Sequence, residues 1–141
     1  MSGDPLSSEI RNYILDLVKR HPTVETIWLI GSRANGAESL QSDWDFVVFR
    51  GDPLFENLAE DNSAHRTDVD LLVVLDDGDS LQRPWGRRKR GSLADWKWIQ
   101  KTDDVASYVG AKWFPDEEQV AKGRDMGEVQ HTKLNALRVW P

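Results

Sequence analysis

The stretch LIGSRANGAESLQSDWDFVVFR, residues 29–50, constrains the fold of this chain more than any other. Gly31 and Ser32 follow an apolar run, and ten residues later Asp43 and Asp45 flank a tryptophan within a second apolar run. An isolated charge costs several kcal/mol to bury unless another group compensates it. The two aspartates are therefore exposed, paired with another group, or bound to a cation.

A helix and a strand are predicted ahead of the Gly-Ser pair. Residues 7–20 repeat apolar side chains at i, i+3, i+4, i+7 and i+8, which is typical of an amphipathic helix. Ser7 or Ser8 can cap its start, and Pro22 follows its end. Residues 26–30 are short, β-branched and aromatic, and this composition predicts a buried strand.

Further elements are predicted after the Gly-Ser pair. Ser32 is a candidate N-cap for a short helix within residues 33–40. Residues 43–49 and 67–75 predict two more strands, and 53–61 predicts one or two helical turns between them. Such an order predicts an α/β (α+β) fold, with a small mixed β-sheet and helices on one face.

The second half of the chain has a weaker pattern. Residues 76–91 are charged, contain Gly and Pro, and predict a loop. Residues 93–101 are a candidate strand, and 116–138 are predicted to be helical. We therefore expect a single domain over 1–141, with a core at about 7–75 and a C-terminal extension, 76–141, of unclear role.

Composition restricts the class of protein. A chain of 141 residues suits one domain with a modest core. The 24 acidic and 18 basic residues give a net charge of −6, which argues against a general nucleic-acid coat and is still compatible with a local basic patch. There is no cysteine, and hence no thiolate metal site. With no signal-peptide pattern and no membrane-length apolar run, we expect a cytoplasmic protein without a membrane partner.

The aspartates can form a metal site. Side chains alternate across a strand, so Asp43 and Asp45 share one face of the second strand, and Asp68 and Asp70 share one face of the third. If the apolar faces pack under the helices, the open face presents Asp43 and Asp45 beside Asp70 or Asp68. Closely spaced carboxylates repel one another unless a cation lies among them. Oxygen ligands of this kind suit Mg²⁺ or Mn²⁺.

The Gly-Ser turn can form a phosphate site beside the metal. Glycine at a strand end lets the backbone approach a phosphate closely. A helix that follows offers unpaired N–H groups and the positive end of its dipole. Ser32 can add a hydroxyl donor and Arg33 a guanidinium. A metal site beside a phosphate site is typical of phosphoryl or nucleotidyl transfer.

The segment GSRANGAESLQSDWD, with apolar residues on either side, resembles the signature of the DNA polymerase β-like nucleotidyltransferase superfamily. It is most similar to the minimal (MNT-type), stand-alone prokaryotic members, over residues 7–75, and implies a nucleotidyltransferase-like fold. Gly31 and Ser32 match the phosphate-binding turn. Asp43 and Asp45 match the two aspartates that hold the metal.

The resemblance also implies a third carboxylate, which comes from a later strand and acts on the attacking hydroxyl. Asp70 is our choice for this residue, and Asp68 is the alternative. The connection from Asp45 to Asp70 is short for minimal members, which implies an abbreviated helix between the two strands.

We therefore expect an enzyme, a Mg²⁺-dependent nucleotidyltransferase that moves a nucleoside monophosphate, AMP from ATP, onto a hydroxyl. Some minimal members of the resembled family adenylylate a HEPN-type RNase toxin, so we expect a hydroxyl on a protein partner. One alternative is a catalytically silent nucleotidyltransferase-fold binding protein, such as an antitoxin-type partner. Another is an antibiotic nucleotidyltransferase, although that class usually carries a second domain that holds the drug.

The basic run, the histidines and all tryptophans but Trp44 lie outside the motif that resembles the family. The basic run RPWGRRKRG, residues 83–91, is either solvated or binds a phosphate tail, an RNA or an acidic partner. Trp28 and Trp44 are predicted to be core residues. Four later tryptophans either pack in the core or form a partner-binding surface: Trp96, Trp98, Trp113 and Trp140. The three histidines fit no ligand spacing and receive no role: His21, His65 and His131.

Overall fold

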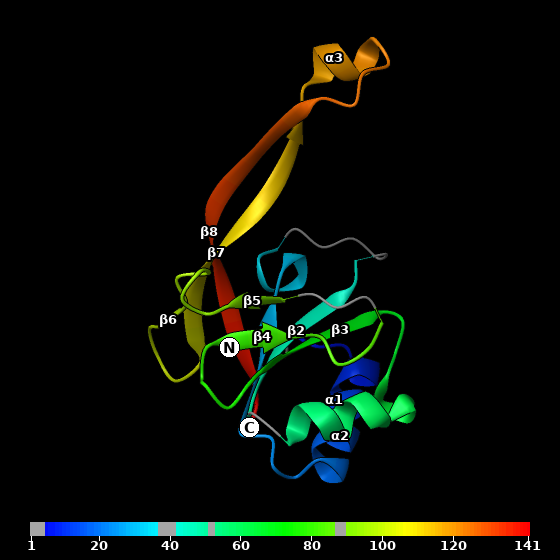
Figure 1. Cartoon of the computed structure of the whole chain (residues 1–141), viewed down its shortest axis with the longest axis vertical. Coiled ribbons are helices and arrows are strands. Elements are labelled where there is room, and N and C mark those ends of the chain that lie inside the picture. Colours follow the sequence, from blue (N-terminus) through cyan, green and yellow to red (C-terminus); the bar gives the residue numbers. More distant parts are fainter. Residues whose placement is uncertain (1–4, 37–41, 51–52, 87–89) are drawn as a thin grey trace.

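The computed structural model of the chain describes residues 5–36, 42–50, 53–86 and 90–141, without the side chains of 90 and 111–113. Its main feature is one eight-stranded mixed sheet with the strand order β5-β4-β3-β2-β1-β8-β7-β6 (Figure 1). The strands are β1 (Thr26–Ile30), β2 (Trp44–Phe49), β3 (Val69–Val74), β4 (Ser80–Gln82), β5 (Arg90–Ser92), β6 (Ile99–Gln100), β7 (Val105–Pro115) and β8 (Gly127–Trp140). The helices are α1 (Ser8–Arg20), α2 (Leu54–Glu60) and α3 (Glu117–Ala121), with 3-10 turns η1 (Ser32–Ala34) and η2 (Asn62–Ala64).

The predicted fold class, a small mixed sheet with helices on one face, is wrong. The molecule is mostly β, and its sheet is a curled, half-barrel-like structure with only small helices. The prediction failed because five of the eight strands, β4 to β8, come from residues 76–141. Three of these five contain only two or three residues, too short for a periodic signal.

The predicted elements of the first half are largely confirmed. Helix α1 starts after Ser7, whose hydroxyl accepts a hydrogen bond from the N–H of Ile10 at 3.2 Å. Strands β1, β2 and β3 occupy the predicted segments, and β2 runs antiparallel to β1 and parallel to β3. Helix α2 provides the crossover between the two parallel strands. The helix expected within 33–40 is reduced to the single turn η1, and residues 37–41 lie outside the described part of the chain.

Two apolar clusters lie on opposite faces of the central strands. On one face, α1 and α2 cover alternate strand residues, including Ile27, Phe46 and Leu71. On the other face, their neighbours Trp28, Val47 and Leu72 pack with residues that β4, β7 and β8 supply. The central strands are thus buried on both sides, and Trp28 and Trp44 are core residues as predicted.

Strands β7 and β8 form a long antiparallel ribbon that projects from the body and carries α3 at its tip (Figure 1). Residues 116–138 were predicted to be helical, but only Glu117–Ala121 are α-helix, and Gly127–Trp140 are a strand. The described side chains of the outer ribbon are mostly exposed, so this part lacks the buried apolar face that reveals a strand. Within the described residues, no helix is long and apolar enough to cross a membrane.

Candidate active site

Asp45 and Asp70 lie directly opposite each other on the parallel strands β2 and β3. Neighbouring strands are about 4.8 Å apart, and residues in register point to the same face. Both aspartates therefore project from the face opposite α1 and α2, and both are half-buried. The alternation predicted from the sequence thus brings these two carboxylates together.

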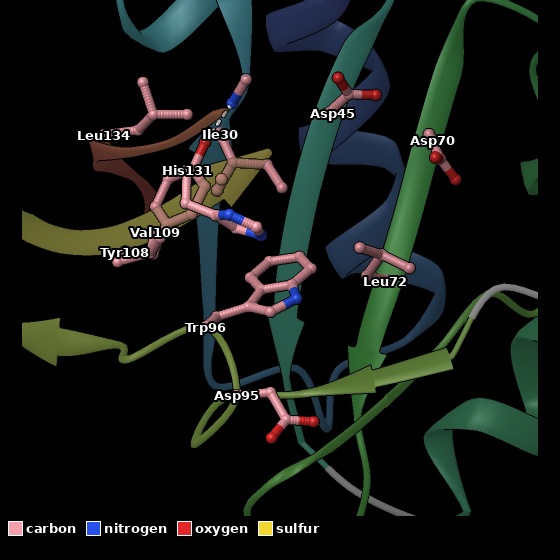
Figure 2. A pocket seen from close by; sticks show the side chains of 12 residues that line it. Ile30, Asp45, Asp70, Leu72, Asp95, Trp96, Tyr108, Val109, His131 and Leu134 are labelled. Atoms are coloured by element: carbon pink, nitrogen blue, oxygen red, sulfur yellow. Dashed lines mark hydrogen bonds between the residues drawn. The ribbon is translucent and has the colours of Figure 1, made fainter. Parts of the chain in front are cut away.

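A cavity of about 520 Å³ opens beside the two carboxylates (Figure 2). Its walls come from β1, β2, β3, β7, β8 and the turn between β5 and β6. The lining residues are Ile30, Gly31, Asp45, Asp70, Leu72, Asp95, Trp96, Tyr108, Val109, Gly110, His131 and Leu134. A volume of this size is within the range of small-molecule sites in proteins.

Gly31 ends β1 at the edge of this cavity, in a conformation with φ 74° and ψ −157°. This region of backbone space is essentially restricted to glycine. A Cβ added to Gly31 would lie 2.8 Å from the Oδ2 atom of Asp45, so this carboxylate would have to shift to admit a side chain. Glycine at position 31 therefore lets the turn approach the carboxylate of Asp45.

The backbone N–H of Gly31 donates a hydrogen bond to the hydroxyl of Tyr108 at 2.8 Å (Figure 2). The sequence predicts that Gly31 belongs to a phosphate-binding turn and that a helix after it offers unpaired N–H groups. That helix is reduced to one 3-10 turn, and Gly31 precedes the turn as its cap. Burial raises the pKa of the Tyr108 hydroxyl, which keeps its proton near neutral pH.

Asn35 ties the same turn to the ribbon. Its amide nitrogen donates to the carbonyl of Gly31 at 2.8 Å and to that of Asn135 at 3.1 Å. Its amide oxygen accepts from the N–H of Asn135 at 2.8 Å. The geometry of the Gly-Ser turn therefore depends on β8 as well as on β1.

Arg83 makes two hydrogen bonds to Asp70, from Nε to Oδ1 at 2.7 Å and from Nη2 to Oδ2 at 2.5 Å. This pair, together with the nearby charge of Asp45, raises the pKa of the Arg83 guanidinium. From the sequence, Arg83 is expected only as a member of the basic run 83–91. The structure makes it the counterion of the carboxylate that we chose as the third catalytic group.

Asp43 precedes β2 and is exposed. It does not line the large cavity. It lines a neighbouring cavity of about 220 Å³, together with Asp70 and Arg83. Asp70 thus borders both cavities. In the described part of the chain, no three His, Cys, Asp or Glu side chains are close enough together to ligate one metal ion.

Asp68, the alternative third carboxylate, has a different partner. Both guanidinium nitrogens of Arg66 that face it donate to its oxygens, and Arg66 also binds Glu9 at 2.8 Å. The hydrogen bonds from Arg66 lower the pKa of Asp68. Asp68 does not line the large cavity, so Asp70 is the one that the fold brings to Asp45.

Ser32 and Arg33, the other predicted phosphate-binding residues, do not line the large cavity either. Ser32 starts the 3-10 turn. Arg33 donates to the carbonyl of Ser42 at 3.2 and 2.8 Å and lies over the ring of Trp44, 4.1 Å from its centroid. In this conformation the Arg33 guanidinium links the Gly-Ser turn to Ser42 and to Trp44 at the start of β2.

Three aromatic residues of the cavity were missed as site residues: Trp96, Tyr108 and His131. Tyr108 and His131 lie on the ribbon strands, which the sequence did not reveal. Trp96 was noted only as one of four late tryptophans. No local motif marks these residues, because they meet the Gly-Ser turn only through the pairing of β1 with β8 and of β8 with β7.

The late tryptophans are expected either to pack in the core or to form a partner-binding surface, and two of them pack against the core. Trp98 packs edge-on against Trp28, with ring centroids 5.5 Å apart, and Trp140 packs against the helix-side cluster. The side chain of Trp113 lies outside the described part of the chain. In the basic run, Trp85 is buried, and residues 87–89 lie outside the description, as does the side chain of Arg90.

No protein-family model matches the sequence, and no curated protein or solved structure is significantly similar to the chain.

Proposed function

We propose that the protein is a Mg²⁺-dependent nucleotidyltransferase that transfers a nucleoside monophosphate, AMP from ATP, to a hydroxyl acceptor. One observation carries this proposal. The in-register carboxylates of Asp45 and Asp70 border a cavity of nucleotide size, directly beside the Gly31 turn. The resemblance of residues 31–45 to the nucleotidyltransferase signature supports the same interpretation of these residues.

The donor set fits Mg²⁺ or Mn²⁺ in part. Mg²⁺ commonly uses one or two carboxylates, several waters and the substrate phosphates, so a complete protein cage is not needed. Asp45 and Asp70 would provide the two carboxylates, and Asp43 would approach from the neighbouring cavity. When bound, the ion would neutralise charge on the phosphates.

The residues of the chain have separate parts in the proposed reaction. The acceptor oxygen forms a bond to the α-phosphorus, the bond from that phosphorus to the β-phosphate oxygen breaks, and pyrophosphate leaves. Asp70 takes the proton of the acceptor hydroxyl. A carboxylate has about four lone-pair sites, and the Arg83 fork occupies two of them, so Asp70 retains capacity for that proton.

Tyr108 contributes to phosphate binding in this proposal. Its oxygen accepts the N–H of Gly31, which leaves its own hydroxyl proton able to donate into the cavity. A hydrogen bond from a neutral hydroxyl to an anionic phosphate is stronger than one between neutral groups. The Tyr108 hydroxyl is thus a phosphate donor in addition to those predicted from the sequence.

The acceptor that we propose is a Tyr, Ser or Thr hydroxyl on a cytoplasmic protein, such as a HEPN-type RNase. This choice rests on the resemblance to minimal nucleotidyltransferases. An antibiotic acceptor is less well supported, because a drug must share an enclosing pocket with the nucleotide. The cavity of about 520 Å³ is matched to one ligand of nucleotide size.

A second candidate is a binding protein that keeps the arrangement and lacks the reaction. The pairing of Asp70 with Arg83 favours this candidate, because an internal cation already neutralises one of the two carboxylates.

A transfer assay separates the two candidates. The purified protein is incubated with α-labelled ATP, Mg²⁺ and candidate acceptor proteins, beside Asp45→Asn and the exposed control Asp103→Asn. An enzyme gives label on an acceptor with wild type and Asp103→Asn and loses it with Asp45→Asn. Unlabelled acceptors in all samples, with ATP still bound, would favour the silent binding protein.

A further inference from the structure

The large cavity has two chemically different sides. Asp45 and Asp70 make one side polar (Figure 2). Gly31 lies next to Asp45. Trp96 and His131 project from the opposite side, where the indole of Trp96 extends into the space beside Asp45 and Leu72 (Figure 2). The proposed function uses only the polar side, so the aromatic side is left without a role.

Both backbone polar groups of Trp96, its N–H and its carbonyl, form hydrogen bonds. Its N–H donates to the carbonyl of Ser92 at 3.1 Å, and its carbonyl accepts from the N–H of Val109 at 2.7 Å. The second bond joins the turn between β5 and β6 to the ribbon. The position of Trp96 therefore follows the position of β7, which also carries Tyr108.

The indole of Trp96 is also positioned by packing. Its ring centroid lies 5.7 Å from that of Tyr108, with a 33° angle between the ring planes. A Cβ on Gly91 would lie 3.3 Å from the indole nitrogen, so glycine at this position gives the ring its space. The side chain is nevertheless only half-buried, and its accessible part faces the cavity.

We propose that Trp96 and His131 form the site of the nucleobase, an inference that rests on the proposed function. Aromatic side chains bind nucleobases by stacking, and every base offers a flat face for this contact. A nucleotide placed with its phosphates at Gly31 and the aspartates has its base on the side of the cavity that carries these rings. The C-terminal extension thereby gains a function, because residues 76–141 supply the whole aromatic side.

Binding measurements with two ligands test this inference. ATP and inorganic tripolyphosphate, each with Mg²⁺, are titrated calorimetrically into wild type, Trp96→Ala and Trp96→Phe. We expect Trp96→Ala to weaken ATP binding about tenfold and to leave tripolyphosphate binding within about twofold. Trp96→Phe keeps a stacking face and should restore most of the ATP affinity.

Trp140→Phe is the matched control, because Trp140 packs against the buried cluster that α1 and α2 cover and does not line the cavity. It should bind both ligands like wild type. Wild-type ATP affinity in Trp96→Ala, or an equal loss for ATP and tripolyphosphate, would overturn the base site and leave the proposed function standing. A wild-type protein that binds neither ligand would overturn both proposals.

Discussion

Arg83 donates two hydrogen bonds to Asp70, the carboxylate that stands in register with Asp45 on the neighbouring strand. A guanidinium is thus paired with a carboxylate that borders both cavities. Arg66 forms a similar pair with Asp68 two residues earlier in the chain, away from the large cavity. The two pairs allow the effect of a lost arginine to be separated from the effect of a freed site carboxylate.

Replacing Arg83 should expose the metal affinity of the aspartates. Arg83→Gln leaves a half-buried carboxylate without its cation, so we expect the free energy of unfolding to fall by about 1–3 kcal/mol. Mn²⁺ should then raise the melting temperature of the variant more than that of wild type. Thermal melts over a series of Mn²⁺ concentrations measure this difference.

Arg66→Gln is the control for this experiment. It should also lower the melting temperature, because it removes the partner of Asp68, but Mn²⁺ should shift it no more than it shifts wild type. Equal Mn²⁺ responses in all three proteins would contradict the assignment of Asp45 and Asp70 to a metal.

The backbone conformation of Gly31 predicts a large cost for any side chain there. Gly31→Ala places a Cβ in a glycine-only conformation and 2.8 Å from Asp45 Oδ2. Gly36→Ala also has a positive φ, of 70°, but meets no atom within 4 Å. We expect Gly36→Ala to cost about 1–2 kcal/mol and Gly31→Ala at least about 1 kcal/mol more.

Urea unfolding of the two glycine variants gives the comparison. Gly31→Ala should also weaken binding of ATP with Mg²⁺, because the added Cβ displaces the Asp45 carboxylate. The assignment of the turn would be wrong if Gly31→Ala were as stable as Gly36→Ala and bound ATP like wild type.

The hydroxyl of Tyr108 should matter for both the turn and the ligand. Tyr108→Phe removes the acceptor of the Gly31 N–H, which we expect to cost about 1 kcal/mol of unfolding free energy. Tyr13→Phe removes a hydrogen bond to the Ala64 carbonyl and should cost a similar amount. Only Tyr108→Phe should weaken ATP binding, by several-fold, because only Tyr108 borders the large cavity. Calorimetric titration of ATP into both variants measures this difference. Equal affinities would contradict a role of Tyr108 in ligand binding.

The relation of Asp45 to Asp70 could be predicted from the sequence in large part. Side chains alternate along a strand, so Asp45 faces away from Phe46 and Asp70 faces away from Leu71 in any register. Both aspartates thus lie on the face opposite α1 and α2. Their alignment follows from the parallel pairing of β2 with β3, which a crossover through α2 makes natural. The choice between Asp68 and Asp70 needed the structure, because the two residues share a face and differ only in position along the strand.

The position of Tyr108 in the site could not be predicted from the sequence. Tyr108 reaches Gly31, 77 residues earlier, because β8 inserts beside β1 and β7 follows β8. Such non-local pairing is not marked by any local motif, and the described side chains of the outer ribbon are mostly exposed. The pairing of Arg83 with Asp70 was equally hidden, because the charge run 83–91 resembles a solvated loop.

The lowered pKa of Asp61 predicts how the free energy of unfolding changes with pH. Asp61 accepts hydrogen bonds from Ser63 and from His21, the latter at 2.8 Å, and these lower its pKa from 3.8 to about 2. A carboxyl with a lowered pKa stabilises the fold above its unfolded pKa and loses this contribution as the pH falls through the folded value. Asp61→Asn should therefore be less stable than wild type at pH 6, and the difference should shrink as the pH falls below about 4.

Urea unfolding at a series of pH values measures the Asp61 effect. Glu25→Gln is the control, because Glu25 forms an exposed pair with Arg50 and should change stability little at any pH. A stability difference between Asp61→Asn and wild type that stays constant from pH 6 to pH 3 would contradict the prediction.

The three aspartates should differ in their contribution to catalysis. Asp45 and Asp70 border the large cavity, whereas Asp43 is exposed and borders only the smaller one. Asp45→Asn and Asp70→Asn should each lower the transfer rate by at least about a hundredfold, a size typical for a lost charge-stabilising group or general base. Asp43→Asn should lower it less. Rates measured over a range of Mg²⁺ concentrations test this order, because an outer ligand lost from Asp43→Asn is partly compensated by more Mg²⁺. If Asp43→Asn were as inactive as Asp45→Asn at every Mg²⁺ concentration, Asp43 would be an inner ligand, as the sequence resemblance implies.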